Sequence, residues 1–172
     1  AMTLHISCRG AALAAALFVF AAILPAAAQS PGGNTLGVQF VYSHQQYEPH
    51  YGLGIQLTAD VIGRLSLDAE ADTFPYGNGG GGLNSIVELA LGPRFRVFSR
   101  RRWAIYAGLL PWLTWSTNGS GVYGWFLEAE GTVEYRLPHR WLWRTTVGYL
   151  GNKNYGNFTG FFQVSSGLAY RF

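Results

Sequence analysis

The chain has 172 residues, a formal net charge of +3 and an aromatic content of 16%, yet only 12% of its residues are charged. That charged share is about half the share found in typical soluble domains, and the mean hydropathy is only +0.10 although 49% of the residues are hydrophobic. Polar and apolar residues are therefore interleaved, which excludes an ordinary soluble helical protein, and the length suits one domain.

The N-terminal segment is typical of a secretory signal peptide. Arg9 precedes an apolar run, Ala11–Leu24, that ends in a proline and three small alanines. The run is shorter than the roughly 20 residues that a membrane-spanning helix needs. We predict a signal peptide over residues 1–28 and an exported domain over residues 29–172. Cys8 is the one cysteine, so the exported domain has no disulfide, which favours a bacterial envelope.

From residue 35 onwards, apolar and polar residues alternate with a period of two, which predicts β-strands with one apolar face. We predict eight strands. In chain order they cover Thr35–Ser43, Gly52–Val61, Leu65–Thr73, Ser85–Val97, Trp103–Trp115, Gly124–Leu137, Trp141–Leu150 and Gly160–Phe172. The alternation is least clear in the fifth strand, where Pro111 predicts a bulge or an irregular end.

The connections alternate between short and long. Short turns follow the second, fourth and sixth strands, at Ile62–Arg64, Phe98–Arg102 and Pro138–Arg140. Longer loops follow the odd strands, at His44–Tyr51, Phe74–Asn84, Ser116–Tyr123 and Gly151–Phe158. An even number of strands with short turns at one end is typical of transmembrane barrels, and about 10 residues suffice for one tilted crossing. The predicted fold is an all-β, eight-stranded antiparallel up-and-down transmembrane β-barrel.

The charged residues share one face of the strands. Eight of the nine acidic residues lie there: Asp60, Asp68, Glu70, Asp72, Glu88, Glu128, Glu130 and Glu134. Five arginines join them: Arg94, Arg96, Arg136, Arg144 and Arg171. Because a basic residue facing lipid costs about 2–4 kcal/mol at the midplane, this face must line the lumen. A soluble lipocalin-like barrel would have the opposite arrangement, with an apolar interior.

The lumen charges are expected to pair with one another. An eight-stranded barrel has room for little more than its own side chains, and buried charges need partners. We predict a network of Asp68, Glu70, Arg94, Arg96, Glu130, Glu134, Arg136 and Arg144. Since the acids outnumber the arginines, those nearest the long loops should meet water, namely Asp72, Glu88 and Glu128. A narrow conducting channel is the alternative interpretation of this lining.

Aromatic residues gather at the ends of the strands, as expected of the two girdles at membrane interfaces. Those next to the short turns are Trp103, Tyr135, Trp141, Trp143, Tyr170 and Phe172. Those near the long loops are Tyr42, Trp115, Trp125 and Tyr149.

The last eight residues form a recognisable motif, with Gly167, Tyr170 and a terminal aromatic, Phe172. With it, the pattern of Thr35–Phe172 resembles the small eight-stranded bacterial outer-membrane β-barrels, which include the OmpA transmembrane domain, OmpX and the opacity-type proteins. The resemblance implies that the motif is an assembly signal read by the barrel assembly machinery. It also implies a monomer in the bacterial outer membrane, in contact with outer-membrane lipid and lipopolysaccharide.

This family contains structural barrels, adhesins and a few lipid A-modifying enzymes. A lipid A deacylase would need a His-x-Ser pair on late strands, and the sixth and seventh predicted strands contain no histidine. His44, Glu48 and His50 share a polar loop and are interpreted as solvated side chains. We therefore predict no catalytic residue, cofactor, metal site or nucleic-acid partner. The expected role is structural, or surface interaction through the long loops; the alternative is a lipid A-modifying enzyme with a site at the rim.

Overall fold

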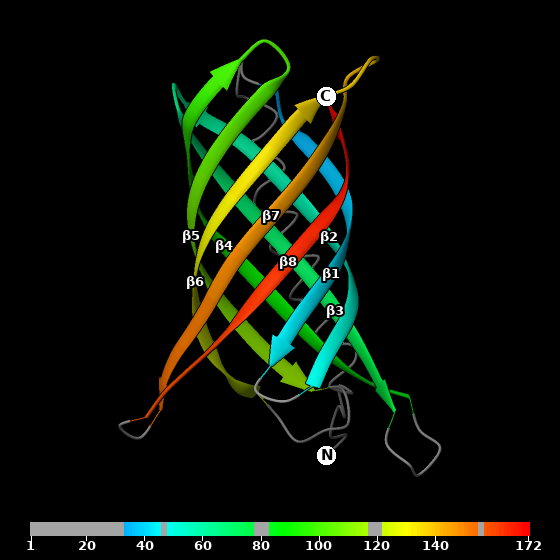
Figure 1. The fold of residues 1–172 in the computed structure, drawn as a ribbon, viewed down its shortest axis with the longest axis vertical. Helices are drawn as coiled ribbons and strands as arrows, with labels where there is room; N and C mark the ends of the chain where they lie inside the picture. Colours follow the sequence, from blue (N-terminus) through cyan, green and yellow to red (C-terminus); the bar gives the residue numbers. More distant parts are fainter. Residues whose placement is uncertain (1–32, 46–47, 78–82, 117–121, 155–156) are drawn as a thin grey trace, which may run out of the picture.

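The computed structural model describes residues 33–45, 48–77, 83–116, 122–154 and 157–172. The predicted signal peptide, residues 1–28, lies outside them. The described residues form one closed barrel in which each strand pairs antiparallel with its neighbours in sequence, and β1 pairs with β8 (Figure 1). The predicted fold class is confirmed. Among the described residues there is no helix of the length and apolarity that crossing a membrane requires.

The eight strands are longer than the sequence predicted. They are β1 (Thr35–Gln45), β2 (Glu48–Ile62), β3 (Leu65–Gly77), β4 (Leu83–Arg100), β5 (Trp103–Ser116), β6 (Val122–Arg136), β7 (Trp141–Asn154) and β8 (Asn157–Arg171). The turns after β2, β4 and β6 and the C-terminus lie at one end of the barrel, and the end of β1 and the start of β2 lie at the other (Figure 1). We call these the short-turn end and the loop end.

The predicted loop boundaries are wrong because the strands continue beyond the alternating segments. His44 pairs with Pro49 and Gln45 pairs with Glu48, so the polar stretch expected to be a loop is mostly paired backbone. Seven of the eight strands, with 13 to 18 residues, exceed the 9–11 residues or so that a tilted crossing needs. The alternation of apolar and polar residues ends where a strand leaves the lipid. Backbone hydrogen bonds between strands do not depend on that alternation, so the strands continue.

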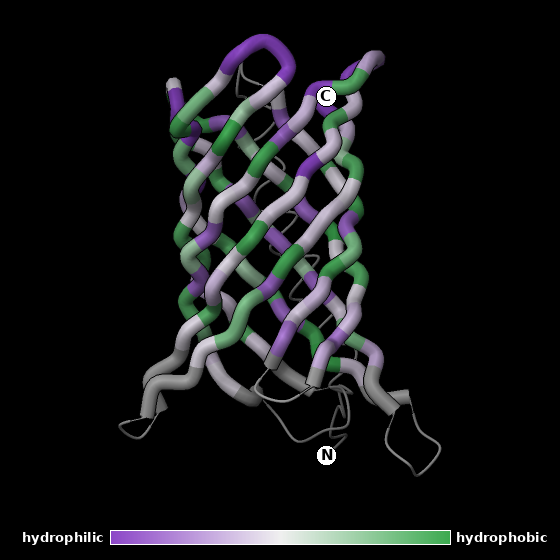
Figure 2. The backbone as a smooth tube through the Cα atoms, viewed as in Figure 1, coloured by the Kyte–Doolittle hydropathy of each residue, from purple (hydrophilic) through white to green (hydrophobic). Residues whose placement is uncertain are grey.

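The charged residues of the strands lie on the inner face, as predicted, and most apolar residues of the other face are exposed, although Leu57, Ala59 and Ala69 are buried. Outward residues such as Leu53 and Leu113 are 66% and 55% exposed, whereas the charged side chains of Asp68 and Arg94 are fully buried in the lumen. Figure 2 shows hydrophobic and hydrophilic positions alternating along the strands. An exposed apolar exterior around a buried charged interior is the arrangement of a barrel that faces lipid.

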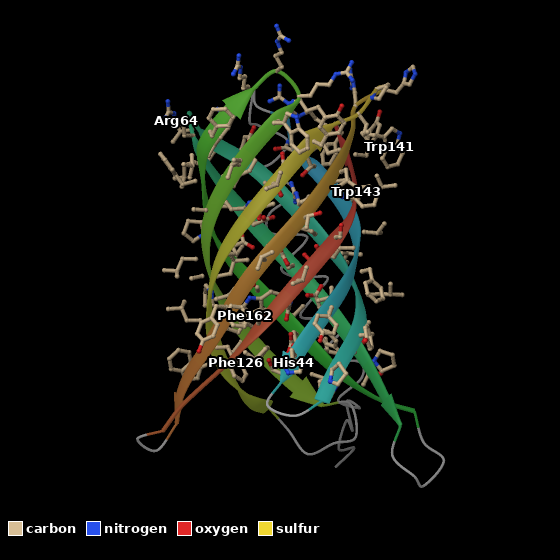
Figure 3. All side chains as sticks on the ribbon, viewed as in Figure 1. His44, Arg64, Phe126, Trp141, Trp143 and Phe162 are labelled. Atoms are coloured by element: carbon tan, nitrogen blue, oxygen red, sulfur yellow. The ribbon has the colours of Figure 1, made fainter. Side chains whose placement is uncertain are left out.

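Aromatic pairs mark both ends of the apolar exterior. At the short-turn end, the rings of Trp103 and Tyr135 lie 4.6 Å apart, and those of Trp141 and Tyr170 lie 5.3 Å apart. Towards the loop end, Tyr149 packs on Phe162 with ring centroids 5.0 Å apart. Figure 3 shows Trp141 and Phe162 at opposite ends of the barrel. Such aromatic girdles are expected at membrane–water interfaces.

The seam between β1 and β8 depends on Gly167, which pairs with Gln39. A Cβ atom at Gly167 would overlap the carbonyl oxygen of Val38 and would lie 2.6 Å from the Cα of Gln39. Both of these neighbours are backbone atoms, so they cannot move aside without opening the seam. The glycine of the C-terminal motif therefore allows the barrel to close.

Replacing Gly167 by alanine should destabilise the barrel by about 1–3 kcal/mol, the usual cost of overpacking. Gly131→Ala is the matched control, because Gly131 also lies on a strand and an added Cβ there meets nothing within 4 Å. The control should change stability by less than about 0.5 kcal/mol. Urea titration in lipid vesicles measures both, and equal losses would show that Gly167 has no special role at the seam.

Candidate functional site

The centre of the lumen is Arg94 on β4, which is fully buried. Its Nη1 donates to Asp68 Oδ2 at 2.7 Å, and its Nη2 donates to Glu134 Oε1 at 3.5 Å. Its Nε lies 3.6 Å from Glu130 Oε1, an ion pair without a hydrogen bond. The guanidinium carbon also lies 4.4 Å from the centre of the Tyr106 ring. The planar guanidinium of Arg94 thus contacts three carboxylates from β3 and β6 and stacks on an aromatic ring.

Arg144 on β7 is the second buried cation. It pairs directly with Glu134 across β6 and β7, and its Nη2 and Nε donate to Glu134 Oε1 at 2.5 and 3.0 Å. It also donates to the hydroxyl oxygens of Thr58 and Thr35, at 3.0 and 3.1 Å. Because Glu134 contacts both arginines, the network links β3, β4, β6, β7, β1 and β2 across the lumen.

Neutral amide groups donate to three carboxylates of the lumen, those of Asp68, Glu70 and Asp72. Gln39 Nε2 donates to Glu70 and to Asp72, each at 3.1 Å. Gln56 Nε2 donates to Asp68 at 3.0 Å and also to Glu70, and Gln163 Nε2 donates to Asp72 at 3.2 Å. Hydrogen bonds from neutral amides stabilise an anion without adding a charge to bury. Sequence reasoning missed these glutamines as partners, although alternation places Gln39 and Gln56 on the lumen face.

Towards the loop end, apolar side chains occupy the lumen. A buried cluster consists of Ala90, Leu110, Trp112, Leu150 and Phe161, with Phe126 packed against it. Trp112 Nε1 donates to Glu128 Oε2 at 2.5 Å. No sequence signal indicated this cluster, because its residues lie on the face that alternation predicts to be polar.

The expectation that the outer acids meet water is wrong. Asp72, Glu88 and Glu128 are 1%, 0% and 2% exposed, because large apolar side chains fill the lumen at this level. Asp72 accepts from two glutamines, Glu128 accepts from Trp112, and Glu88 Oε1 accepts from Thr114 at 3.4 Å. Buried side chains surround these three carboxylates.

The structure does not bring Arg96 and Arg136 into the predicted network. Arg96 Nη2 donates to the carbonyl of Gly63 at 2.8 Å, and Arg136 Nη1 donates to the carbonyl of Arg101 at 3.3 Å. Both side chains lie at the short-turn rim, where the strands end. There a guanidinium reaches solvent and turn carbonyls instead of the buried carboxylates. Neither forms an ion pair with an acid in the described part of the chain.

Two residues of the predicted assembly signal, Tyr170 and Phe172, lie at the same rim, whereas Gly167 lies deeper in the wall, opposite Gln39 and Arg144. Tyr170 and Phe172 are 39% and 49% exposed, and the Phe172 amide donates to the carbonyl of Asn34 at 2.9 Å. This bond ties the chain end to the start of β1, so the motif lies at the seam that closes the barrel.

One small cavity borders the lumen side chains. This cavity of about 10 Å³ lies at the β1–β8 seam beside Gln39, Gln56 and Arg144, and it could hold about one water molecule. Over the described residues, no three or more His, Cys, Asp or Glu side chains are arranged to hold a metal ion. His44, one of the histidines of the polar stretch, has its Nδ1 3.4 Å from the Tyr42 hydroxyl.

No protein-family model and no curated protein sequence matches the chain. Solved structures do. Neisserial surface protein A is 9% identical, with a TM-score of 0.59, covering 81% of this chain and 96% of its own. Ail, an outer membrane protein of Yersinia pestis, in a phospholipid bilayer nanodisc, is 14% identical, with a TM-score of 0.50, covering 82% and 99%. A de novo designed transmembrane β-barrel is 14% identical, with a TM-score of 0.52, covering 84% and 98%.

These likenesses concern the fold, because identities this low carry no function with them. The chain has the eight-stranded barrel fold of small outer-membrane proteins, as the resemblance predicted.

Proposed function

We propose that the protein is a monomeric outer-membrane barrel whose filled interior is a scaffold and whose loop end faces the cell exterior as an interaction surface. The observation that carries this proposal is the full burial of Arg94 among three carboxylates of the lumen. Side chains that pair across the barrel would hold its wall rigid and would leave no charged lining for an aqueous path.

The proposal includes the export route. The leader at residues 1–28 would direct the chain out of the cytoplasm, and Gly167, Tyr170 and Phe172 would be read by the barrel assembly machinery. Short turns are periplasmic in bacterial barrels of this kind, and long loops are extracellular. Outer-membrane lipid and lipopolysaccharide would then surround the apolar exterior.

The orientation can be tested with Lys153, the only lysine of the chain, which lies on β7 at the loop end. A membrane-impermeant amine reagent added to intact cells should label the protein there. Lys153→Arg is the matched control, because it retains the charge and removes the reactive amine; it should abolish the labelling. Labelling only after the cells are opened would contradict a surface-exposed loop end.

We assign no catalytic role to the seven buried lumen carboxylates, because groups that are at most 6% exposed cannot touch a lipid substrate. Incubating the refolded protein with lipopolysaccharide should leave the mass of lipid A unchanged. The loss or gain of one acyl chain would instead support an enzyme with a site at the rim.

A further inference from the structure

Basic residues are concentrated at the short-turn end. Eight of the twelve lysines and arginines lie there: Arg64, Arg96, Arg100, Arg101, Arg102, Arg136, Arg140 and Arg171. The segments 61–65, 95–104 and 135–142, which form this rim, contain no Asp or Glu. Figure 3 shows nitrogen-tipped side chains projecting beyond this end. A ring of unbalanced positive charge attracts anions at the membrane surface.

A groove lies under one part of this rim, where the β4–β5 turn meets the outer wall. It has a volume of about 350 Å³ and is lined by Phe98, Arg100, Arg101, Trp103, Ile105 and Val133. Its apolar residues point outward and are exposed, with Ile105 at 41% and Val133 at 39%. The groove therefore has a cationic edge at the turn and an apolar floor that continues along the lipid-facing wall.

The two arginines of the groove are available to a ligand. Two other arginines of this rim already have partners: Arg102 Nη1 donates to the Tyr135 hydroxyl at 3.4 Å, and Arg136 donates to a turn carbonyl. By contrast, the guanidinium groups of Arg100 and Arg101 make no hydrogen bond or ion pair with any part of the chain that the structure describes. They are placed beside Trp103, in the aromatic girdle that marks the interface.

We propose that this groove binds an anionic phospholipid of the periplasmic leaflet. The phosphate accepts hydrogen bonds from Arg100 and Arg101, since guanidinium matches phosphate geometry with paired donors. One acyl chain lies along Ile105 and Val133, where the wall already faces lipid. The periplasmic source follows from the proposed orientation, on which this part of the inference rests, because short turns face the periplasm.

Arg101 and Arg140 offer a matched pair of variants for the test. Both are non-glycine residues with positive φ, at 48° and 68°, in short turns of the same rim, and only Arg101 lines the groove. Glycine adopts such a backbone without strain, so Arg101→Gly and Arg140→Gly should both fold. Each removes one positive charge from the rim, which separates a local site from a general effect of charge.

Native mass spectrometry of the purified protein, titrated with phosphatidylglycerol, phosphatidylcholine or lipid A, tests the proposal. The wild-type protein should retain one phosphatidylglycerol at least about fivefold more tightly than phosphatidylcholine, since an interfacial arginine contributes about that factor. Arg101→Gly should weaken this binding about fivefold, and Arg140→Gly should leave it unchanged. Val133→Trp, which fills the groove without altering charge, should also weaken it.

Equal affinity for the two phospholipids, or equal losses in Arg101→Gly and Arg140→Gly, would overturn the site. Tighter binding of lipid A would overturn the periplasmic source. These outcomes are distinct from a failure of the proposed orientation: a phosphatidylglycerol preference that needs Arg101, together with labelling of Lys153 only in opened cells, would support the groove and contradict the orientation.

Discussion

Replacing Arg94 by methionine should destabilise the barrel by about 3–5 kcal/mol, the usual cost of removing one partner of a buried ion pair. Arg94 contacts three carboxylates, from Asp68, Glu130 and Glu134. Methionine is apolar, so these groups would lose their shared cation in a space that excludes water. Urea titration in lipid vesicles, followed by tryptophan fluorescence, measures the loss.

Arg96→Met is the matched control, because Arg96 lies two residues away on the same strand and donates only to a turn carbonyl. Its effect should stay within about 0.5 kcal/mol. Adding Asp68→Asn to Arg94→Met should recover part of the stability, because one stranded charge is removed. Similar losses for Arg94→Met and Arg96→Met, or no recovery in the double variant, would contradict the assignment of Arg94 as the central cation.

Leu109→Arg should cost about 2–4 kcal/mol, as a basic residue does when it faces lipid near the midplane. Leu109 lies in the middle of β5, pairs with Ala129 and is 47% exposed on the outer wall. Lipid offers no hydrogen bonds to a guanidinium there. The stability in vesicles gives the magnitude.

The effect should depend on depth. Val61→Arg places the same group on the outer wall near the short-turn end of β2, where Val61 is 51% exposed. Its cost should be only about 0–1 kcal/mol, because the side chain reaches the interface. Equal costs at the two positions would mean that Leu109 does not lie within the hydrocarbon layer.

Alternation in the sequence predicted which face each charged residue occupies, but it could not predict depth. Arg94 and Arg96 share a face, yet one is fully buried and the other lies at the rim. The difference arises because β3 begins at Leu65, which pairs with Phe95, so Arg94 still lies beside β3 whereas Arg96 lies at the level of the β2–β3 turn. The depth of a side chain in the lumen depends on where its strand ends and on how neighbouring strands are staggered. A two-residue alternation gives no information on either.

The sequence also could not predict which side chains form hydrogen bonds across the barrel. Gln163 bonds to Asp72, 91 residues away, because closure brings β8 and β3 to face each other through the lumen. Trp112 lies on the same face as the charges and was not expected in a polar lumen; its indole N–H bonds to a carboxylate while its ring joins the apolar cluster. A pattern that classes each residue as either apolar or polar cannot represent tryptophan, which has an apolar ring and a polar N–H group.

Planar-bilayer recording of the wild-type protein tests most directly whether the lumen is a filled scaffold. Buried arginine–carboxylate pairs and the apolar cluster around Trp112 lie in the lumen, and the filled scaffold that we propose has no continuous aqueous path, so we expect a silent baseline after insertion is verified. Long-lived, uniform ion-conducting openings from the intact protein would contradict a filled lumen and would show that the charged lining serves an open channel.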